Sequence, residues 1–529
     1  MTVLRPDRAA DVLVLGGGPA GAWAAVAAAE SGARVVLADK GYLGTSGAAA
    51  AGGNNLWYVP PQDDVRRAAI ESREAEGGML TDRSWMWRTL DSTWRNVDRL
   101  STWGYPFPTD AHGVVRRSSL QGPQYMRLMR RQVRRSGVTV LDQHPAAELL
   151  VDGDGVVSGA AGIRRQDGNE PWSVRAGAVV LATGGCAFLS GALGCNTNTG
   201  DGHLMAAELG AHLSGMEFSC TYGMAPGFGA QTKGRMYQFA NYYHADGSVM
   251  NLPGGFAGRA AVARRMVDEI VYVRLDNAPA AMHEAMRWAQ PNFFLPFDKA
   301  GIDPFRDVFP VRLVLEGTVR GTGGLRLVSE GCATTVPGLF AAGDAATREL
   351  VTGGRSGGGS HNGAWAISSG TWAGHAAAAF GRRRTPSTLL TPAGRHGVRA
   401  DDGQPAADAA EIVTATQRQV TPLMVNLFRN AGPMTAAAQA LDDIWKNHVR
   451  GLGDLTRHGH RPREAAAMVA HARWMYRSAL ARSESRCMHR RDDLPDTDPA
   501  QQHRLLSGGL DSVWVDVDDR AGLELEKAS

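Results

Sequence analysis

The chain has 529 residues, of which 43% are hydrophobic and 21% charged, and its formal net charge is +3. This length is enough for about two to four domains, and a charge so close to zero argues against nucleic acid or an anionic membrane as a partner. The five cysteines are scattered and fit no metal-ligand motif, so we expect no metal site and no disulfide framework. With no apolar run of about 20 residues and no signal peptide, the sequence predicts a cytoplasmic protein without a membrane span.

The first forty residues contain a βαβ motif. A short apolar run is followed by Gly16, Gly18 and Gly21 in G-x-G-x-x-G spacing, by an alanine-rich helix, and by a second apolar run that ends in Asp39. The glycines let the backbone approach a pyrophosphate, and the start of the helix offers free N–H groups to its charge. Asp39 lies where a carboxylate can accept hydrogen bonds from an adenosine ribose. The motif predicts a bound dinucleotide, with a merely structural glycine turn as the alternative.

The segments that follow predict a loop, helices and a small sheet. The loop around Thr45 and Ser46 is rich in glycine and alanine, which lets backbone pass close to a large flat ligand. Residues 63–102 and 123–136 show the periodicity of helices. Alternating apolar residues then predict the strands of a small antiparallel sheet at residues 138–141, 147–151, 155–163 and 172–174.

A second glycine turn follows further along the chain. The buried-type strand 178–181 leads into it, so we expect the dinucleotide to be contacted from two places. A helix is predicted at residues 203–209, with Asp201 near its first turn, where plain N-capping is an equally simple role. From 222 to 314 the α/β rhythm gives way to aromatic residues, glycine and methionine, which indicates an inserted lid.

The core pattern returns after this insertion. A strand ends in Gly343 and Asp344, and a glycine loop precedes a helix that begins near Ser360. Residues 381–410 are rich in proline, glycine and charge and predict a linker or a mobile surface loop. Amphipathic helices are predicted from 411 to about 485, and a loose strand at 512–517.

Seven separated motifs together resemble one family. In chain order they are GGGPAG, GTSGAAAAGGNN, LATGG, NTGDGHLMAAELGAHLSGMEF, PGLFAAGDA, GGRSGGGS and ALARSESRCMHRRDDLPDTD, the last of which is similar to the signature ESRGxHxRxDxP. They resemble the flavoprotein subunits of the fumarate reductase and succinate dehydrogenase family, which also contains L-aspartate oxidase and the adenylylsulfate reductase α-subunit. The resemblance covers nearly the whole chain and implies FAD, rather than NAD, as the dinucleotide.

The resemblance also implies the architecture. We expect an α/β fold in which a Rossmann-like FAD-binding domain carries an inserted capping domain, the lid, and is followed by a helical C-terminal domain. The predicted parts are residues 1–221 and 315–380 for the FAD-binding domain, 222–314 for the lid, 381–410 for a linker and 411–529 for the helical domain.

The family's FAD contacts can be carried over to this chain. Glycines of the first turn would hold the pyrophosphate, Asp39 the adenosine ribose, and Ser360 would begin a helix whose positive end faces the flavin. The predicted cofactor-binding residues are Gly16, Gly18, Pro19, Ala20, Gly21, Asp39, Lys40, Thr45, Ser46, Gly52, Gly53, Ala146, Ala182, Thr183, Gly184, Asp201, Gly343, Asp344 and Ser360.

The sequence also departs from the family. Some members attach FAD through a histidine in the loop after the second strand, and this chain has no histidine there, so we expect noncovalent FAD. Fumarate and succinate enzymes hold their dicarboxylate with two histidines, and Val319 and Val351 stand at the corresponding positions. These changes argue against a C4-dicarboxylate substrate.

Three residues are candidates for catalysis. Arg355, the counterpart of a family arginine, would hold a substrate carboxylate or stabilise developing charge, unless it only pairs with an acid to fix its loop. Arg235 in the lid or His361 at the start of a helix would carry the proton, with packing and capping as their alternative roles.

The sequence therefore predicts an FAD-dependent oxidoreductase: a dehydrogenase, reductase or oxidase. It would exchange a hydride between flavin N5 and a small polar or anionic substrate beneath the lid. The alternative is the flavoprotein α-subunit of a two-component, adenylylsulfate reductase-like enzyme for a sulfur compound. The resemblance implies a ferredoxin-like iron–sulfur partner, and it leaves open whether the chain assembles with itself or with other subunits.

Overall fold

The computed structural model describes most of the chain, with short gaps. The described residues are 4–109, 113–232, 236–356, 360–385, 387–399 and 406–518. Among them no helix is both long and apolar enough to cross a membrane.

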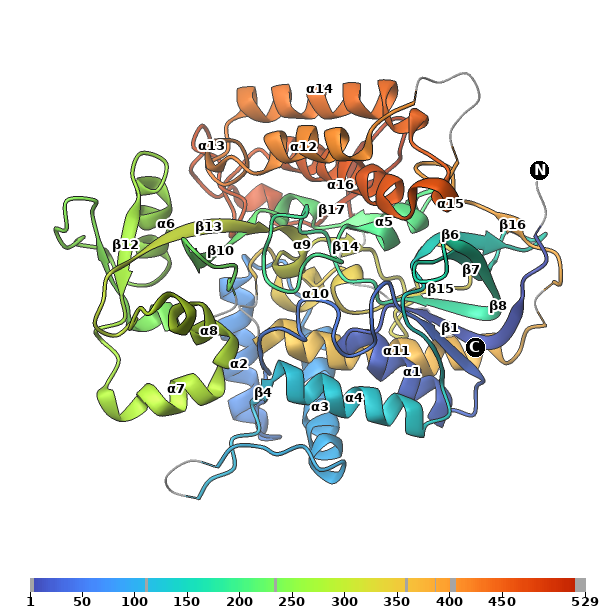
Figure 1. Cartoon of the computed structure of the whole chain (residues 1–529), viewed down its shortest axis with the longest axis horizontal. Coiled ribbons are helices and arrows are strands. Elements are labelled where there is room, and N and C mark those ends of the chain that lie inside the picture. Colours follow the sequence, from blue (N-terminus) through green and yellow to red (C-terminus); the bar gives the residue numbers. More distant parts are fainter. Residues whose placement is uncertain are drawn as a thin grey trace.

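A mixed sheet of eight strands forms the centre of the molecule, in the order β16-β6-β7-β8-β1-β2-β5, with β15 paired to β8 (Figure 1). The strands β1, β2, β5, β8 and β15 run parallel, so their carboxyl ends meet at one edge, where α/β sheets bind ligands. The bounds are β1 Arg8–Leu15, β2 Val35–Ala38, β5 Thr139–Leu141, β6 Ala146–Val151, β7 Val157–Arg164, β8 Glu170–Leu181, β15 Leu339–Ala341 and β16 Thr391–Pro392.

Two of the predicted strand assignments were wrong. Residues 172–174 and 178–181 belong to a single strand, β8, which pairs antiparallel with β7 at its start and parallel with β1. Residues 138–141 were placed in the small antiparallel sheet, but β5 pairs in parallel with β2. Periodicity reports which face of a strand is buried and carries no information about its partner, so a strand that changes neighbours along its length cannot be recognised from it.

Helices cover the parallel part of the sheet. The helix α1 (Pro19–Glu30) packs along α11 (Ser360–Gly381), and the contact depends on glycine because a Cβ at Gly374 would lie 2.3 Å from the carbonyl oxygen of Ala24. The remaining helices of this part are α2 Asp63–Glu76, α3 Arg83–Thr102, α4 Gly122–Arg135, α5 Asp201–Ala207, α9 Gly317–Arg320 and α10 Glu349–Thr352. Short strands β3 (Gly53–Asn55) and β4 (Ser119–Gln121) pair beside them.

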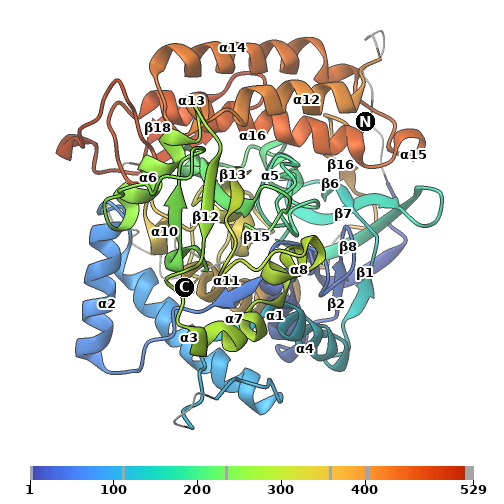
Figure 2. The ribbon, with the colours of Figure 1, turned by 60° about the vertical axis from the view of Figure 1, so that its left-hand side comes forward.

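A second sheet with three helices stands to one side of this core (Figures 1 and 2). It has the strand order β10-β13-β12-β11 and its own apolar cluster of phenylalanines and valines. We call this part the lid; its predicted bounds, 222–314, stay a prediction. Its elements are β10 Thr221–Pro226, β11 Asn241–Tyr243, α6 Gly255–Arg265, β12 Val271–Arg274, α7 His283–Ala289, α8 Pro291–Ala300 and β13 Phe309–Glu316.

The C-terminal helices form a layer over the core, at the top of Figure 1. The longest, α16 (Arg461–Ala481), is buried along nearly its whole length, between α12 and α14 and the elements beneath. The others are α12 Ala409–Val420, α13 Leu423–Asn426, α14 Ala431–Asn447 and α15 Leu455–His458, and a small sheet joins β9 Leu213–Ser214, β14 Gly324–Leu325, β17 Leu505–Gly508 and β18 Trp514–Val517.

The described part of the predicted linker is folded against the sheet. β16 pairs with β6, and Leu390 forms a bridge with Leu4. Arg399 makes an ion pair with Glu148 of β6 at 2.7 Å. This segment, which has no periodicity of its own, is held by pairing with distant strands.

Candidate active site

A pocket enclosing about 1580 Å³ of space, part of it open to solvent, lies at the carboxyl ends of β1, β2 and β8. We call it the cofactor pocket. Its lining includes most of the predicted cofactor residues: Gly16, Gly18, Pro19, Ala20, Asp39, Lys40, Ser46, Gly53, Ala146, Ala182, Thr183, Gly184, Asp201, Gly343 and Asp344. The other four lie outside the lining but within two residues of it: Gly21, Thr45, Gly52 and Ser360.

The glycines of the first turn have different tasks. A Cβ at Gly16 would lie 2.3 Å from the carbonyl oxygen of Ala182, and one at Gly21 only 1.8 Å from that of Gly16, so both positions close the turn. A Cβ at Gly18 would meet nothing within 4 Å, and its φ of −70° suits any residue. Gly18 therefore leaves open space directly before the N-terminus of α1, which is where a phosphate binds.

Asp39 closes the second strand as predicted, and its carboxylate is occupied by backbone. One oxygen accepts the N–H of Gly17 at 2.5 Å and the other that of Gly41 at 2.7 Å. Burial raises the pKa of Asp39 above its ordinary value. The carboxylate holds the glycine turn in place, and its contact with a ribose stays a prediction.

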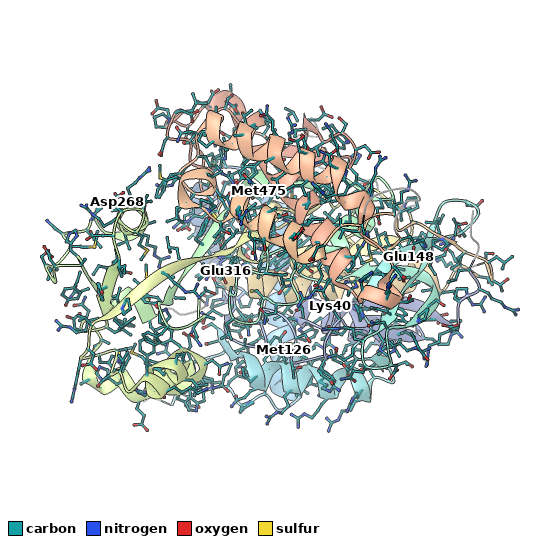
Figure 3. All side chains as sticks on the ribbon, turned by 45° about the horizontal axis from the view of Figure 1, so that its top comes forward. Lys40, Met126, Glu148, Asp268, Glu316 and Met475 are labelled. Atoms are coloured by element: carbon teal, nitrogen blue, oxygen red, sulfur yellow. The ribbon has the colours of Figure 1, made fainter. Side chains whose placement is uncertain are left out.

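Lys40 joins the pocket to the C-terminal helices. Its Nζ lies 2.7 Å from Asp201 and 2.7 Å from Glu464 of α16, and His460 lies 3.2 Å from the same Asp201 oxygen. Burial alone would lower the pKa of Lys40, but the two carboxylates raise it above its ordinary value. Burial likewise would raise the pKa of Asp201, and Lys40 and His460 lower it. Asp201, His460 and Glu464 are buried and Lys40 is nearly so, and Figure 3 shows Lys40 beneath the C-terminal helices.

Four polar side chains of the pocket have a buried atom without a hydrogen-bond partner among the described residues. They come from distant segments: Thr183 Oγ1, Asn198 Oδ1, Gln290 Oε1 and Asn362 Oδ1. A buried polar atom without a partner costs about 1–3 kcal/mol, so this lining fits a polar ligand. Together with the open space at Gly18, it meets the requirement of a dinucleotide such as FAD.

The lining also contains residues that were not predicted from the sequence, and three of them have polar side chains from distant segments. Asn198 follows the second glycine turn, Gln290 lies between α7 and α8 of the lid, and Arg320 ends α9. Asn198 is the first residue of the motif NTGDGHLMAAELGAHLSGMEF, from which only Asp201 was predicted as a contact, and Gln290 belongs to no motif. Arg320 also had a signal in the sequence, because it directly follows Val319 in the stretch TVRGTGG.

Of the three catalytic candidates, the two that the structure describes, Arg355 and His361, are not brought together in this pocket. Arg355 lies in another cavity, beside Arg486 and Arg490, with its Nη1 3.5 Å from Glu76 of α2. His361 lies against the ring of Trp57, with 4.6 Å between ring centroids, next to the lining but not in it. Arg235 lies outside the described residues. A sequence places a residue beside a loop and does not give the direction of its side chain.

The two valines at the family's histidine positions also differ in placement. Val319 lines the cofactor pocket, whereas Val351 is fully buried in α10 and does not. Neither can bind an anion.

Two family models match the chain. Residues 11–223 match the model described as "FAD binding domain", and residues 418–506 match the one described as "Fumarate reductase flavoprotein C-term". The chain is 26% identical to a fumarate reductase flavoprotein subunit of Mycobacterium tuberculosis (strain H37Rv), with 92% of each chain covered. It is 27% identical to an L-aspartate oxidase of Mycobacterium leprae, covering 93% of this chain and 94% of that one.

Solved structures share the fold over nearly the full length. The flavoprotein of E. coli quinol fumarate reductase superposes with a TM-score of 0.79 at 21% identity, and 96% of each chain is covered. An adenosine-5-phosphosulfate reductase in complex with sulfite gives 0.75 at 19% identity, covering 96% of this chain and 95% of that one. The matches confirm the predicted α/β fold with a helical C-terminal part and confirm FAD as the cofactor.

Proposed function

The chain belongs to the fumarate reductase and succinate dehydrogenase family of FAD-dependent oxidoreductases, and on this premise we propose that it exchanges a hydride between flavin N5 and a small polar or anionic substrate beneath the lid. The observation that carries the proposal is the cofactor pocket with its unpartnered polar atoms. One of them, Gln290 Oε1, belongs to the lid, so the lid forms part of the wall. A substrate bound there would be held between lid and cofactor, which excludes water from the reacting atoms.

The chain's own residues supply the binding and the protons. Gly18 and the N-terminus of α1 would receive the pyrophosphate, and Asp39 keeps that turn in shape. We retain Arg355, His361 and Arg235 as candidates for substrate binding and proton transfer, although Arg355 must turn away from Glu76 to reach the pocket.

The reduced flavin must pass its electrons to an acceptor outside this chain. The scattered cysteines give the chain no redox relay, so electrons leave to oxygen, to a small acceptor or to another protein. We propose a ferredoxin-like iron–sulfur protein as that partner. Purified chain that is reduced by substrate and reoxidised by ferredoxin faster than by air would support it, and equal rates would contradict it.

A purified sample tests the proposal directly. We expect flavin absorbance, release of FAD on denaturation because attachment is noncovalent, and bleaching of the flavin by a small acid under anaerobic conditions. Protein that refolds with FAD but is bleached by none of a broad panel of metabolites would contradict the proposed reaction.

Two glycine variants make the site assignment specific. Gly18→Val should fold normally, since its Cβ meets nothing within 4 Å, yet lose FAD because the side chain fills the space before α1. Gly153→Ala is the matched control, because Gly153 also faces open space but lies in an exposed turn away from the pocket. If Gly18→Val keeps full FAD content, the pyrophosphate does not bind at this turn.

A further inference from the structure

Arg320 is a positively charged group in the wall of the cofactor pocket, at the place where the lid joins the core. It ends α9, the turn that follows the lid strand β13, and its side chain is 24% exposed. Behind it lies Glu316, which is fully buried and does not line the pocket. Figure 3 shows Glu316 at the end of β13, where the lid meets the rest of the molecule.

Glu316 holds the arginine from one side only. Arg320 Nη1 donates to Glu316 Oε2 at 3.0 Å and to the carbonyl oxygen of Thr232 at 3.2 Å. The other Glu316 oxygen accepts the Thr232 hydroxyl at 2.7 Å, which fixes the carboxylate. Within the described residues these are the hydrogen bonds of the Arg320 side chain, so the donors on Nε and Nη2 remain for a ligand.

The other charges of the lining are already matched inside the protein. Lys40 pairs with Asp201, Asp344 pairs with Arg348, and Asp39 accepts backbone N–H groups. Of the two cations in the described lining, Lys40 has a partner in the lining itself, whereas the partner of Arg320, Glu316, lies behind the wall, so at Arg320 the pocket faces the cation and not its acid. A guanidinium whose Nε–Nη2 edge is free can bind a carboxylate through two parallel hydrogen bonds.

The backbone around Arg320 is fixed as well. Arg348, which is fully buried, donates from Nη2 to the carbonyl oxygens of Thr318, Val319 and Gly321. The turn that carries Arg320 is thus tied down on both sides of the residue. A fixed turn lowers the ordering cost of binding.

We propose that Arg320, held by Glu316, anchors a carboxylate group of the substrate at the lid end of the cofactor pocket. The inference rests on the proposed function, because it assumes that substrate binds between lid and FAD. It assigns the substrate's anionic group to a residue outside the three candidates of the sequence analysis.

The test uses the FAD-loaded protein and measures binding without turnover. Acetate and oxalate are titrated into the oxidised protein, and the dissociation constant is read from the change in flavin absorbance. We expect Arg320→Gln to keep one FAD per chain and to weaken the binding of both anions about tenfold or more. Arg320→Lys should give intermediate affinities, because lysine keeps the charge but lacks the paired N–H donors of a guanidinium. Arg312→Gln is the matched control, since Arg312 is an exposed arginine of β13, the strand that leads into α9, and should leave the constants unchanged.

Each contrary result is separable from failure of the proposed function. Loss of FAD in Arg320→Gln would assign the arginine to the cofactor's pyrophosphate and overturn the proposal. Unchanged anion affinity, or a changed affinity for sulfite at flavin N5 without a change for carboxylates, would also overturn it. If instead the parent protein binds no FAD, the proposed function itself fails.

Discussion

Lys40 connects the cofactor pocket to the C-terminal helices through two ion pairs, one with Asp201 of the pocket and one with Glu464 of α16. Replacing it with methionine leaves Asp201 and Glu464 buried together without the ammonium group that lies between them. Removing one partner from a buried ion pair costs about 3–5 kcal/mol. We therefore expect Lys40→Met to lower the free energy of unfolding in urea by that order and to reduce FAD content.

The control for this variant lies on the same acid. Arg461 also pairs with Glu464, at 2.8 Å, but its side chain is 65% exposed. Exposed pairs contribute about 1 kcal/mol or less, so Arg461→Met should change stability little. Equal losses in the two variants would show that burial of the pair does not matter.

Glu349 predicts a pH dependence of stability. Burial, with the nearby charge of Glu217, raises its pKa from 4.5 to about 8, and Ser214 donates to it at 2.6 Å. Between these two values the folded chain keeps a proton that the unfolded chain has lost. The stability from this group is complete below pH 4.5 and is lost as the pH rises to about 8, at about 1 kcal/mol per pH unit.

A glutamine at this position imitates the protonated acid at every pH. We expect the free energy of unfolding of Glu349→Gln to be closer to that of the parent at pH 5 and to exceed it at pH 8. Urea unfolding at both pH values measures this difference. A difference between the two proteins that does not change with pH would contradict the assignment.

Single residues also show where prediction from sequence stopped. Gly16, Gly18 and Asp39 line the pocket as their spacing predicted, because local turn chemistry determines their positions. Arg355 was expected at the flavin, and its side chain lies against Glu76, which no local pattern reports. Cys487 stands where the signature ESRGxHxRxDxP has glycine, and its φ is +54°. The backbone there keeps the left-handed conformation that favours glycine, although the residue is a cysteine.

At the scale of elements, the contact of α1 with α11 sets the position of the phosphate-binding turn. An alanine at Gly374 would place its Cβ 2.3 Å from the carbonyl oxygen of Ala24 and push the helices apart. Overpacking of this kind costs about 1–3 kcal/mol. We expect Gly374→Ala to lower the unfolding midpoint in urea and to weaken FAD binding, because α1 carries the turn.

Gly432 supplies the comparison within another helix. It lies in α14 with open space around its Cβ position, so Gly432→Ala should be neutral or stabilising. Similar destabilisation by both alanines would point to backbone entropy and away from helix contact. The glycine turn with its alanine-rich stretch predicted α1, and the glycine loop before Ser360 predicted α11, but the close contact of these two helices became visible only with the structure.

At the scale of the whole molecule, the cofactor pocket is assembled from parts that are distant in sequence. Thr183, Asn198, Gln290 and Asn362 each contribute an unpartnered atom, and Gln290 belongs to the lid. Sequence motifs predicted many of the lining residues that come from the core, because the spacing within a motif is local. They could not predict the lining residue Gln290 of the lid, because the contact of the lid with the core depends on how two sheets pack.

This assembly predicts that FAD and ADP stabilise different extents of the chain. Both ligands should bind the adenosine site near Gly18 and Asp39 and so raise the melting temperature of protein stripped of cofactor. At a ligand concentration of 100 times Kd, the free energy of unfolding should rise by about 2.7 kcal/mol. Only FAD is long enough to reach Gln290, so only FAD should slow hydrogen exchange in α7 and α8 of the lid. Equal protection of these helices by ADP would mean that the lid responds to the nucleotide end alone, and that Gln290 does not face the flavin.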